Sequence, residues 1–306
     1  MRVAIVGAGG VGGYLGVRLN QSGLDVIWLA RGRSLAHLRE IGIALRNPLG
    51  DVTLGPQQAS DSPEALGRAD LVIVTVKLYD LGDLAPRLRP LLGPSTAVLP
   101  LQNGVEAYAM LAACLPAEAL LKGTVAIKSR LASPGEIVCK SPFCRIKIGE
   151  GTGVPGERVE RIVAVLNACI GVEVAVSADI DVDIWKKFAM LASFSAISCL
   201  ARASIGEVLD SPEARELVIA AANEAAAVGR GLGVGLPRDV TELVLSQVRD
   251  MPKDGRPSML EDLEAGRRLE LKFLSGSVVR LGRQAGVPTP LHSLAYRVLA
   301  MHALGR

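Results

Sequence analysis

The sequence predicts an α/β protein in which a doubly wound parallel sheet is followed by a second, all-helical domain. Up to residue 176, short apolar runs typical of buried parallel strands alternate with segments of helical periodicity. From residue 178 the pattern is helical throughout, with breaks at 231–237, 254–257 and 286–290. A chain of 306 residues is long enough for two domains. We therefore expect one domain at residues 1–177 and another at residues 178–306.

The chain begins with a strand, a glycine-rich turn and a helix, in the order that a dinucleotide-binding site requires. The apolar run at 2–6 leads into Gly7-Ala8-Gly9-Gly10-Val11-Gly12, and a helix is expected at 11–22. In such a turn the first glycine permits the bend, the second leaves room for the pyrophosphate and the third lets the helix pack against the strand. The helix N-terminus then favours the phosphates. Because another strand follows at 26–30, we predict a Rossmann-type dinucleotide-binding domain.

The end of that second strand indicates which dinucleotide binds. An NAD site usually has an Asp or Glu there, which accepts hydrogen bonds from the ribose 2'-hydroxyl. This chain has Ala30-Arg31-Gly32-Arg33 instead, and a guanidinium can bind a 2'-phosphate through two hydrogen bonds. The pattern favours NADP as cofactor, with Arg31 as its 2'-phosphate contact. The alternative is that Arg31 and Arg33 are solvent-exposed loop charges.

Two later strands bring further candidate residues to the same edge. Strands expected at 71–76 and 97–101 end at Lys77 and at Gln102-Asn103-Gly104. Strand ends on this side of a doubly wound sheet face the cofactor. Lys77 is therefore either a phosphate or ribose contact or a solvated lysine, and Asn103 is either a site residue or a turn residue before Gly104.

The remaining elements of the first domain follow from local pattern. A hairpin is expected from 43–45 and 52–54. Helices are expected at 34–40, 81–92 and 157–168, and a strand at 172–176. Strands near 121–127, 136–139 and 144–148 are expected to complete the parallel sheet.

Composition excludes several classes of function. A formal net charge of +3 gives no sign of a nucleic-acid or acidic-membrane partner. The five cysteines show no C-x-x-C spacing, so neither a disulfide framework nor a metal site is expected. The longest uncharged stretch, 188–201, has about 14 residues, whereas a membrane span needs roughly 20. The N-terminus has no signal-peptide pattern. We expect a cytoplasmic protein.

A lysine on the helix at 181–200 is the clearest chemical signal in the second domain. At about 100° per residue, Lys187 shares a face with Ile184, Phe188, Leu191, Phe194 and Ser195, whereas Lys186 points nearly the opposite way. Because burying an unpaired ammonium is costly, Lys187 must reach solvent, pair with a carboxylate or serve a site. The three histidines, His37, His292 and His302, are not expected near a nicotinamide. Lysine is therefore the better candidate for a general acid.

Together these residues resemble the ketopantoate reductase (2-dehydropantoate 2-reductase) family, over essentially the whole chain. The resemblance runs through the glycine turn, Arg31, Lys77, Gln102-Asn103-Gly104, Trp185-Lys186-Lys187-Phe188, Ser258-Met259-Leu260, Glu270 and Gly286-Val287-Pro288-Thr289-Pro290.

The resemblance implies NADPH-dependent reduction of ketopantoate to pantoate, a step towards pantothenate and coenzyme A. It implies that Lys187 protonates the substrate carbonyl and that Glu270 pairs with the substrate hydroxyl or with the lysine. It places Asn103 beside nicotinamide and substrate, and gives Ser258 the substrate carboxylate. The substrate, a small 2-oxo acid, would then lie between the two domains, whose closure would exclude water.

The spacing of Ser258 and Glu270 requires a bend, because 12 residues span about 18 Å of unbroken helix. We expect the break at Gly266-Arg267-Arg268, between a short helix opened by the capping box Ser258-Met259-Leu260-Glu261 and a longer helix at 269–285. Capping is the alternative role for Ser258. For Glu270 the alternative is a surface carboxylate beside Arg267 or Arg268.

Four positions depart from the family pattern and make the expected pocket less polar. Leu191 and Ser195 occupy two positions at which the family has asparagines that bind the substrate. Gly255 occupies a third asparagine position, and Leu269 occupies a threonine position. Fewer hydrogen-bonding groups weaken discrimination between substrates. Three functions stay open: ketopantoate reduction, reduction of a less polar 2-oxo acid or ketone, and NADP sensing without turnover. The sequence leaves the oligomeric state open, with a homodimer as one option.

Overall fold

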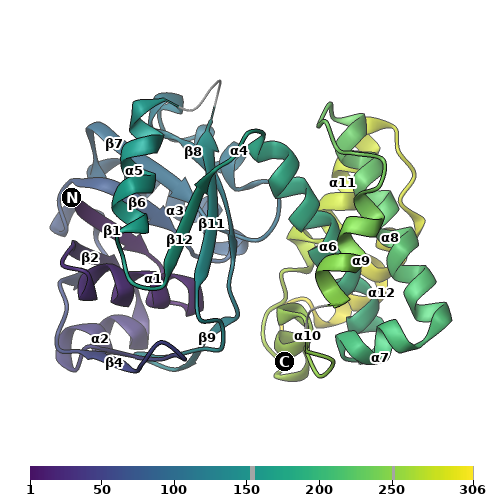
Figure 1. Ribbon diagram of the computed structural model, residues 1–306, viewed down its shortest axis with the longest axis horizontal. Helices are drawn as coiled ribbons and strands as arrows, with labels where there is room; N and C mark the ends of the chain where they lie inside the picture. The colour runs from purple at the N-terminus through teal and green to yellow at the C-terminus, as the bar shows by residue number, and fades with distance from the viewer. Residues whose placement is uncertain (152–155, 250–251, 306) are drawn as a thin grey trace. The chain divides into compact units, whose positions relative to one another are not determined.

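The computed structural model describes residues 1–151, 156–249 and 252–305, and it forms two compact units (Figure 1). The N-terminal unit comprises Met1–Gln102 and Glu106–Ile180, and the C-terminal unit comprises Asn103–Val105 and Asp181–Arg306. The expected boundary lay between residues 177 and 178.

A five-stranded parallel sheet forms the centre of the N-terminal unit, as predicted. Its strand order is β5-β2-β1-β6-β7, and every pairing is parallel. The strands are β1 (Arg2–Val6), β2 (Asp25–Leu29), β5 (Ala59–Ser60), β6 (Ala69–Val74) and β7 (Leu92–Pro100). Val6 pairs with both Leu29 and Val74, so the carboxyl ends of β1, β2 and β6 lie level at one edge. This edge carries the glycine turn.

The strands expected to complete that sheet form two separate sheets instead, which corrects the prediction. One has the order β4-β3-β10-β9, from Val52–Leu54, Ile43–Arg46, Glu136–Cys139 and Ser129–Ser133, and the other has the order β12-β11-β8, from Val172–Val176, Cys144–Glu150 and Leu121–Ala126. The predicted hairpin of β3 and β4 is confirmed. The reason for the separate sheet lies in α1 (Gly10–Gln21), which packs on β1 and β2 and also on β3, β9 and β10. A helix buried on two sides needs a second sheet to cover it.

The other helices of this unit are α2 (Gly32–Glu40), α3 (Leu78–Leu84), α4 (Ala107–Ala112) and α5 (Glu157–Asn167), with short 3-10 turns at Pro63–Ala65 and Ala117–Ala119. The single helix expected at 81–92 is wrong. The chain forms α3 and then a 3-10 helix, Ala85–Leu91. Pro86 and Pro90 lack the N–H groups that an α-helix needs, and this explains the tighter turn.

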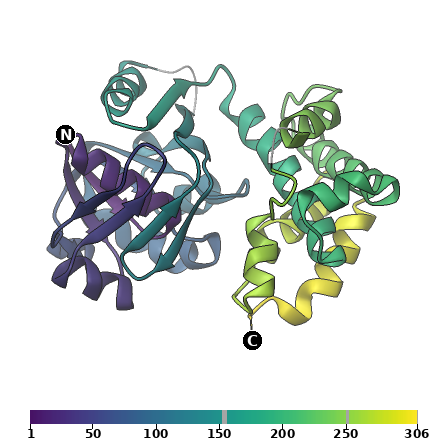
Figure 2. The ribbon, with the colours of Figure 1, turned by 60° about the horizontal axis from the view of Figure 1, so that its bottom comes forward.

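The C-terminal unit is helical in its described part, as predicted (Figure 1 and Figure 2). Its α-helices are α6 (Ile180–Ala201), α7 (Ile205–Asp210), α8 (Pro212–Gly231), α9 (Val240–Arg249), α10 (Ser258–Glu264), α11 (Ser275–Ala285) and α12 (Pro290–Leu299). Two 3-10 turns, Leu271–Phe273 and Ala300–His302, complete it. The core gathers side chains of α6, α8, α9, α10 and α11.

The expectation of one apolar stripe on α6 is wrong, because this helix is buried almost all round its second half. Residues 192–199 are all buried, on every side of the helix. In the first half Trp185 and Phe188 enter the core, whereas Ile184, Lys187 and Leu191 are only partly buried. The face that carries Lys187 is therefore the more open one.

Among the described residues, α6 alone has the length and composition of a membrane span, with a mean hydropathy of 1.3 in its most apolar window. The uncharged stretch at 188–201 is part of this longer helix of 22 residues. Since 61% of the window is buried inside the structure, α6 has the burial typical of a core helix.

Candidate functional site

The glycine turn lies between β1 and α1 with a geometry that only glycine accommodates at Gly7, Gly10 and Gly12. A Cβ on Gly10 would lie 2.5 Å from the Ser129 carbonyl oxygen. Gly7 has φ +103°, in a region that other residues rarely adopt. A Cβ on Gly12 would collide with the Gly7 carbonyl oxygen and the Thr75 hydroxyl, so α1 packs directly on the turn. Gly9 differs, because nothing lies within 4 Å of where its Cβ would be. The turn is thus tightly packed behind and open at Gly9.

Thr75 secures this turn, although no sequence motif indicates this role. It follows β6, and its backbone N–H donates to the Val6 carbonyl oxygen at 2.9 Å. Its hydroxyl lies 2.9 Å from the Gly7 carbonyl oxygen and 3.0 Å from that of Val6. A hydroxyl that follows a buried strand and a glycine motif is the available signal, but sequence alone does not show that the two segments meet.

The N-terminus of α1 fits the phosphates of a dinucleotide. Gly9 is its N-cap and makes no side-chain capping hydrogen bond. The first N–H groups of such a helix lack intrahelical acceptors and carry the positive end of its dipole. On its other side, the Ser129 hydroxyl of β9 donates to the Gly10 carbonyl oxygen at 2.8 Å and fixes the turn. Residues 7–12 could therefore hold a pyrophosphate through backbone donors.

Arg31 stands at the end of β2, as the N-cap of α2, with 77% of its side chain exposed. Its Nη2 pairs with Oδ2 of Asp80, in the first turn of α3, at 2.8 Å. Lys77 is the N-cap of α3 and is partly buried. Arg33 is exposed. The guanidinium of Arg31 thus keeps access to solvent while one of its N–H groups is bound to a carboxylate.

Lys187 and Asn103 meet directly. The Lys187 Nζ donates a hydrogen bond to Asn103 Oδ1 at 3.0 Å, across 84 residues of sequence. Both side chains are partly buried. Contacts group Asn103 with the C-terminal unit, so this pair lies within one compact unit. The amide oxygen gives the ammonium a fixed direction without neutralising its charge.

The neighbours of Lys187 on α6 anchor it. Trp185 and Phe188 stack edge to face with ring centroids 5.3 Å apart, and both are buried. A Cβ on Gly229 of α8 would lie 2.8 Å from the Trp185 ring, so the indole packs closely on that helix. Ile184 and Leu191, one turn to either side of Lys187, are partly buried. Lys187 is therefore carried by a closely packed helix, with an apolar residue about one turn before it and another about one turn after it.

Glu270 is a buried carboxylate, 3% exposed, at the N-cap of the Leu271–Phe273 turn. Its interpretation as a surface carboxylate beside Arg267 or Arg268 is therefore wrong. Arg267 pairs with Asp262 at 2.7 Å instead. The predicted bend after α10 is confirmed, but the longer helix begins at Ser275 and not at 269.

Ser258 is exposed and occupies the first residue of α10, after Pro257 as N-cap. The predicted capping box at Ser258 is wrong, because this helix has no side-chain capping hydrogen bond. The complete capping box of this unit that the structure describes lies at Ser204 and Glu207, which open α7. A proline before Ser258 already supplies the extended residue that ends the loop.

The four positions that depart from the family pattern differ in their surroundings. Leu191 is partly buried, whereas Ser195 and Leu269 are 2% and 3% exposed. Gly255 lies in a turn where a Cβ would be 2.7 Å from the Pro252 carbonyl oxygen. Position 255 cannot carry a side chain unless the backbone of this turn shifts. Of the four, Leu191 alone lies beside Lys187 on the partly buried face of α6.

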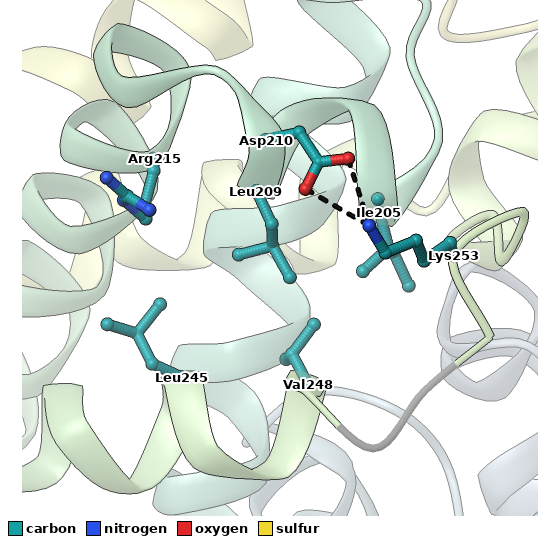
Figure 3. A pocket seen from close by; sticks show the side chains of 8 residues that line it. Ile205, Leu209, Asp210, Arg215, Leu245, Val248 and Lys253 are labelled. Carbon is teal, nitrogen blue, oxygen red and sulfur yellow. Dashed lines mark hydrogen bonds and ion pairs between the residues drawn. The ribbon is translucent and has the colours of Figure 1, made fainter.

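A separate pocket of about 240 Å³ lies within the C-terminal unit (Figure 3). Leu209, Leu245 and Val248 point into it, and Lys253 pairs with Asp210 at its rim at 3.3 Å. None of the predicted site residues lines this pocket. The part of the chain that the structure describes contains no group of His, Cys, Asp and Glu that could hold a metal ion.

Comparison with known proteins identifies the family. The ketopantoate reductase PanE/ApbA model matches residues 3–153, and its C-terminal model matches residues 179–303. The chain is 32% identical to the uncharacterized oxidoreductase YkpB of Bacillus subtilis, over 99% of both chains. It is 31% identical to a 2-dehydropantoate 2-reductase of Mesorhizobium japonicum, over 95% of this chain and 94% of that one.

Solved structures agree with the sequence matches. The 2-dehydropantoate 2-reductase of Geobacter metallireducens superposes with a TM-score of 0.91 at 28% identity, over 98% of this chain and 99% of that one. The chain therefore belongs to the ketopantoate reductase PanE/ApbA family of oxidoreductases.

Proposed function

We propose that this chain reduces a small 2-oxo acid with NADPH, and that its substrate is ketopantoate, which it converts to pantoate. The observation that carries the proposal is the Lys187 ammonium held 3.0 Å from Asn103 Oδ1 on the open face of α6. A fixed ammonium in a partly desolvated position is suited to protonate a carbonyl oxygen. Family membership supports this class of reaction.

In this proposal the residues of the C-terminal unit act on the substrate. A bound nicotinamide cofactor would supply the hydride for the carbonyl carbon, and Lys187 would give a proton from Nζ to the carbonyl oxygen. As negative charge develops on that oxygen, the ammonium stabilises it electrostatically. Asn103 accepts one N–H of Lys187 and so would orient the ammonium towards the substrate. Glu270, a buried carboxylate of the same unit, would bind the substrate hydroxyl or the lysine.

The cofactor side of the proposal depends on the N-terminal unit. Backbone donors of residues 7–12 would bind the pyrophosphate, with Gly9 leaving room for its approach. Arg31 would bind the 2'-phosphate, because its guanidinium is exposed at the strand end where an NAD site has a carboxylate. Lys77, the N-cap of α3 and three residues beyond β6, would add a second cation.

A less polar 2-oxo acid or ketone is the second candidate substrate. Leu191 is partly buried one turn from Lys187, and Ile184 flanks the lysine on the other side. An apolar side chain at position 191 offers no hydrogen bond to a carboxylate or hydroxyl. The same hydride and proton transfers would then act on a substrate with a bulkier apolar group.

A substrate panel tests the proposal. NADPH and NADH oxidation would be measured with ketopantoate and with 2-oxo acids of increasing apolar size, and the product checked by NMR. We expect the highest kcat/KM for ketopantoate with NADPH, and a further gain with it in Leu191→Asn. Preference for a bulkier acid would favour the second candidate. Tight NADPH binding without turnover of any carbonyl compound would contradict both and indicate a sensor.

The cellular role and the assembly are separate expectations. Growth of a pantothenate-requiring bacterial strain that lacks this reductase, restored by the chain but not by Lys187→Ala, would support a role in pantothenate biosynthesis. Light scattering on the purified protein would test the homodimer. A cytoplasmic location stays a prediction from the sequence.

A further inference from the structure

The proposed 2'-phosphate ligand is paired with a carboxylate that the sequence motif does not reveal. Arg31 Nη2 and Asp80 Oδ2 lie 2.8 Å apart, with the arginine side chain 77% and the aspartate 23% exposed. Arg31 follows β2, and Asp80 follows β6 in the first turn of α3. The pair therefore links segments from two strand ends of one compact unit.

The sheet places this ion pair at the edge where β1 enters the glycine turn. Strands β2 and β6 flank β1 on its two sides. Val6, the last residue of β1, pairs with Leu29 on β2 and with Val74 on β6, so the three strands end at the same level. Asp80 thus belongs to the same edge as the turn that would bind the dinucleotide.

A carboxylate in contact with Arg31 changes what that arginine can select. A 2'-phosphate carries up to two negative charges, and one that bonds to the free N–H groups of Arg31 must come near the Asp80 carboxylate. The attraction to the guanidinium is then opposed by repulsion from the carboxylate. A ribose 2'-hydroxyl has no charge, so the same carboxylate does not repel it.

We propose that Asp80 is a specificity-determining residue, which reduces the preference of this chain for NADPH over NADH by partly neutralising Arg31. The proposal rests on the proposed function in one respect, namely that a nicotinamide dinucleotide binds at the glycine turn. It adds that the strength of the NADPH preference is set by an ion pair and not by Arg31 alone.

Equilibrium binding measurements test the role of Asp80 without depending on turnover. Dissociation constants for NADPH and NADH would be measured by nucleotide fluorescence for the wild type, Asp80→Asn and Asp83→Asn. Asp83 lies on the same helix and is exposed, so its substitution removes an equal charge as a matched control. Asp80→Ser provides a second variant in case the asparagine disturbs α3.

In Asp80→Asn we expect the ratio of the NADH to the NADPH dissociation constant to rise about fivefold, chiefly through tighter NADPH binding. In Asp83→Asn the ratio should stay within about twofold. Because Arg31 is exposed and Asp80 partly so, raising the salt concentration should shrink the effect. The fragments 2',5'-ADP and 5'-AMP should show the same contrast, since they carry the distinguishing phosphate without the nicotinamide.

An unchanged ratio in both Asp80 variants would overturn the assignment. A fall in the ratio would also overturn it, because Asp80 would then hold Arg31 in its phosphate-binding position. If the wild type binds neither dinucleotide, the proposed function itself fails. If both bind and the ratio does not respond, only the role of Asp80 fails.

Discussion

His292 gives the C-terminal unit a pH-dependent stability whose size can be worked out. The imidazole of this α12 residue is fully buried. Its Nε2 lies 3.0 Å from the Ala221 carbonyl oxygen, so that nitrogen must carry the proton. Nδ1 then accepts from the Ser275 hydroxyl at 3.3 Å. Protonation of Nδ1 would break that arrangement and bury a charge, and burial lowers the pKa of His292 to about 4.

The difference between the pKa of His292 and its ordinary value of 6.5 sets the size of the contribution to stability. Since one pKa unit is worth about 1.4 kcal/mol, neutral His292 contributes about 3 kcal/mol of pH-dependent stability. In the folded state the pKa is depressed, so this contribution is complete above pH 6.5 and is lost as the pH falls towards 4. By pH 5 about 2 kcal/mol should be gone.

Urea unfolding of the wild type and His292→Gln at pH 8, 7, 6 and 5 would measure this. In a Trp28→Phe background Trp185 is the remaining tryptophan and reports on the C-terminal unit. Glu224 has the opposite sign, because burial raises the pKa of its carboxyl even though it accepts hydrogen bonds from the N–H groups of Leu291 and His292. Both proteins keep Glu224, so its contribution cancels in the difference between them.

We expect the stability advantage of the wild type over His292→Gln to shrink by about 2 kcal/mol between pH 8 and pH 5. The variant itself can be less stable at every pH, because the prediction concerns only the change in the gap. A gap that stays constant within about 0.5 kcal/mol would refute the reasoning. An NMR titration of His292 with an ordinary pKa would refute it as well.

Further predictions concern the glycine turn and the lysine. Gly12→Ala should cost about 2–3 kcal/mol of stability and abolish NADPH binding, since its Cβ would collide with the Gly7 carbonyl oxygen. Gly9→Ala should change stability by less than about 1 kcal/mol while weakening NADPH binding, since its methyl group enters open space. Equal losses of stability in the two glycine variants would contradict both predictions. Asn103→Ala should lower kcat about tenfold, because Lys187 loses the hydrogen bond that orients its ammonium. A wild-type kcat would show that this hydrogen bond has no part in turnover.

Local sequence signals predicted the parts of the fold whose cause is local. The parallel strands, the glycine turn and the breaks between the C-terminal helices follow from apolar runs, glycines and prolines, and the structure confirms them. The separate sheet over α1 could not be predicted from such local signals. Its strand β9 is mostly exposed and lacks an apolar run, and its pairing depends on which side of α1 is left uncovered.

The same limit applies to the candidate site. Periodicity singled out Lys187 on an apolar face but left open whether the lysine reaches solvent, pairs with a carboxylate or serves a site. In the structure this face of α6 is the more open one. The ion pair of Arg31 with Asp80 and the hydrogen bond of Thr75 to the turn join segments that are distant in sequence. Such contacts depend on the register of the strands, which a single sequence does not contain. Glu270 was open to a surface interpretation because its polar character gave no sign of burial.

The proton-donor role of Lys187 is the central claim, and one pair of variants tests it most directly. Lys186 and Lys187 are consecutive on α6 and both are partly buried, so Lys186→Ala is a matched control for Lys187→Ala. In the rate of NADPH oxidation with saturating ketopantoate, we expect Lys187→Ala to lose at least about 100-fold and Lys186→Ala to stay within about threefold of the wild type. Turnover in Lys187→Ala equal to that of the wild type would contradict the account.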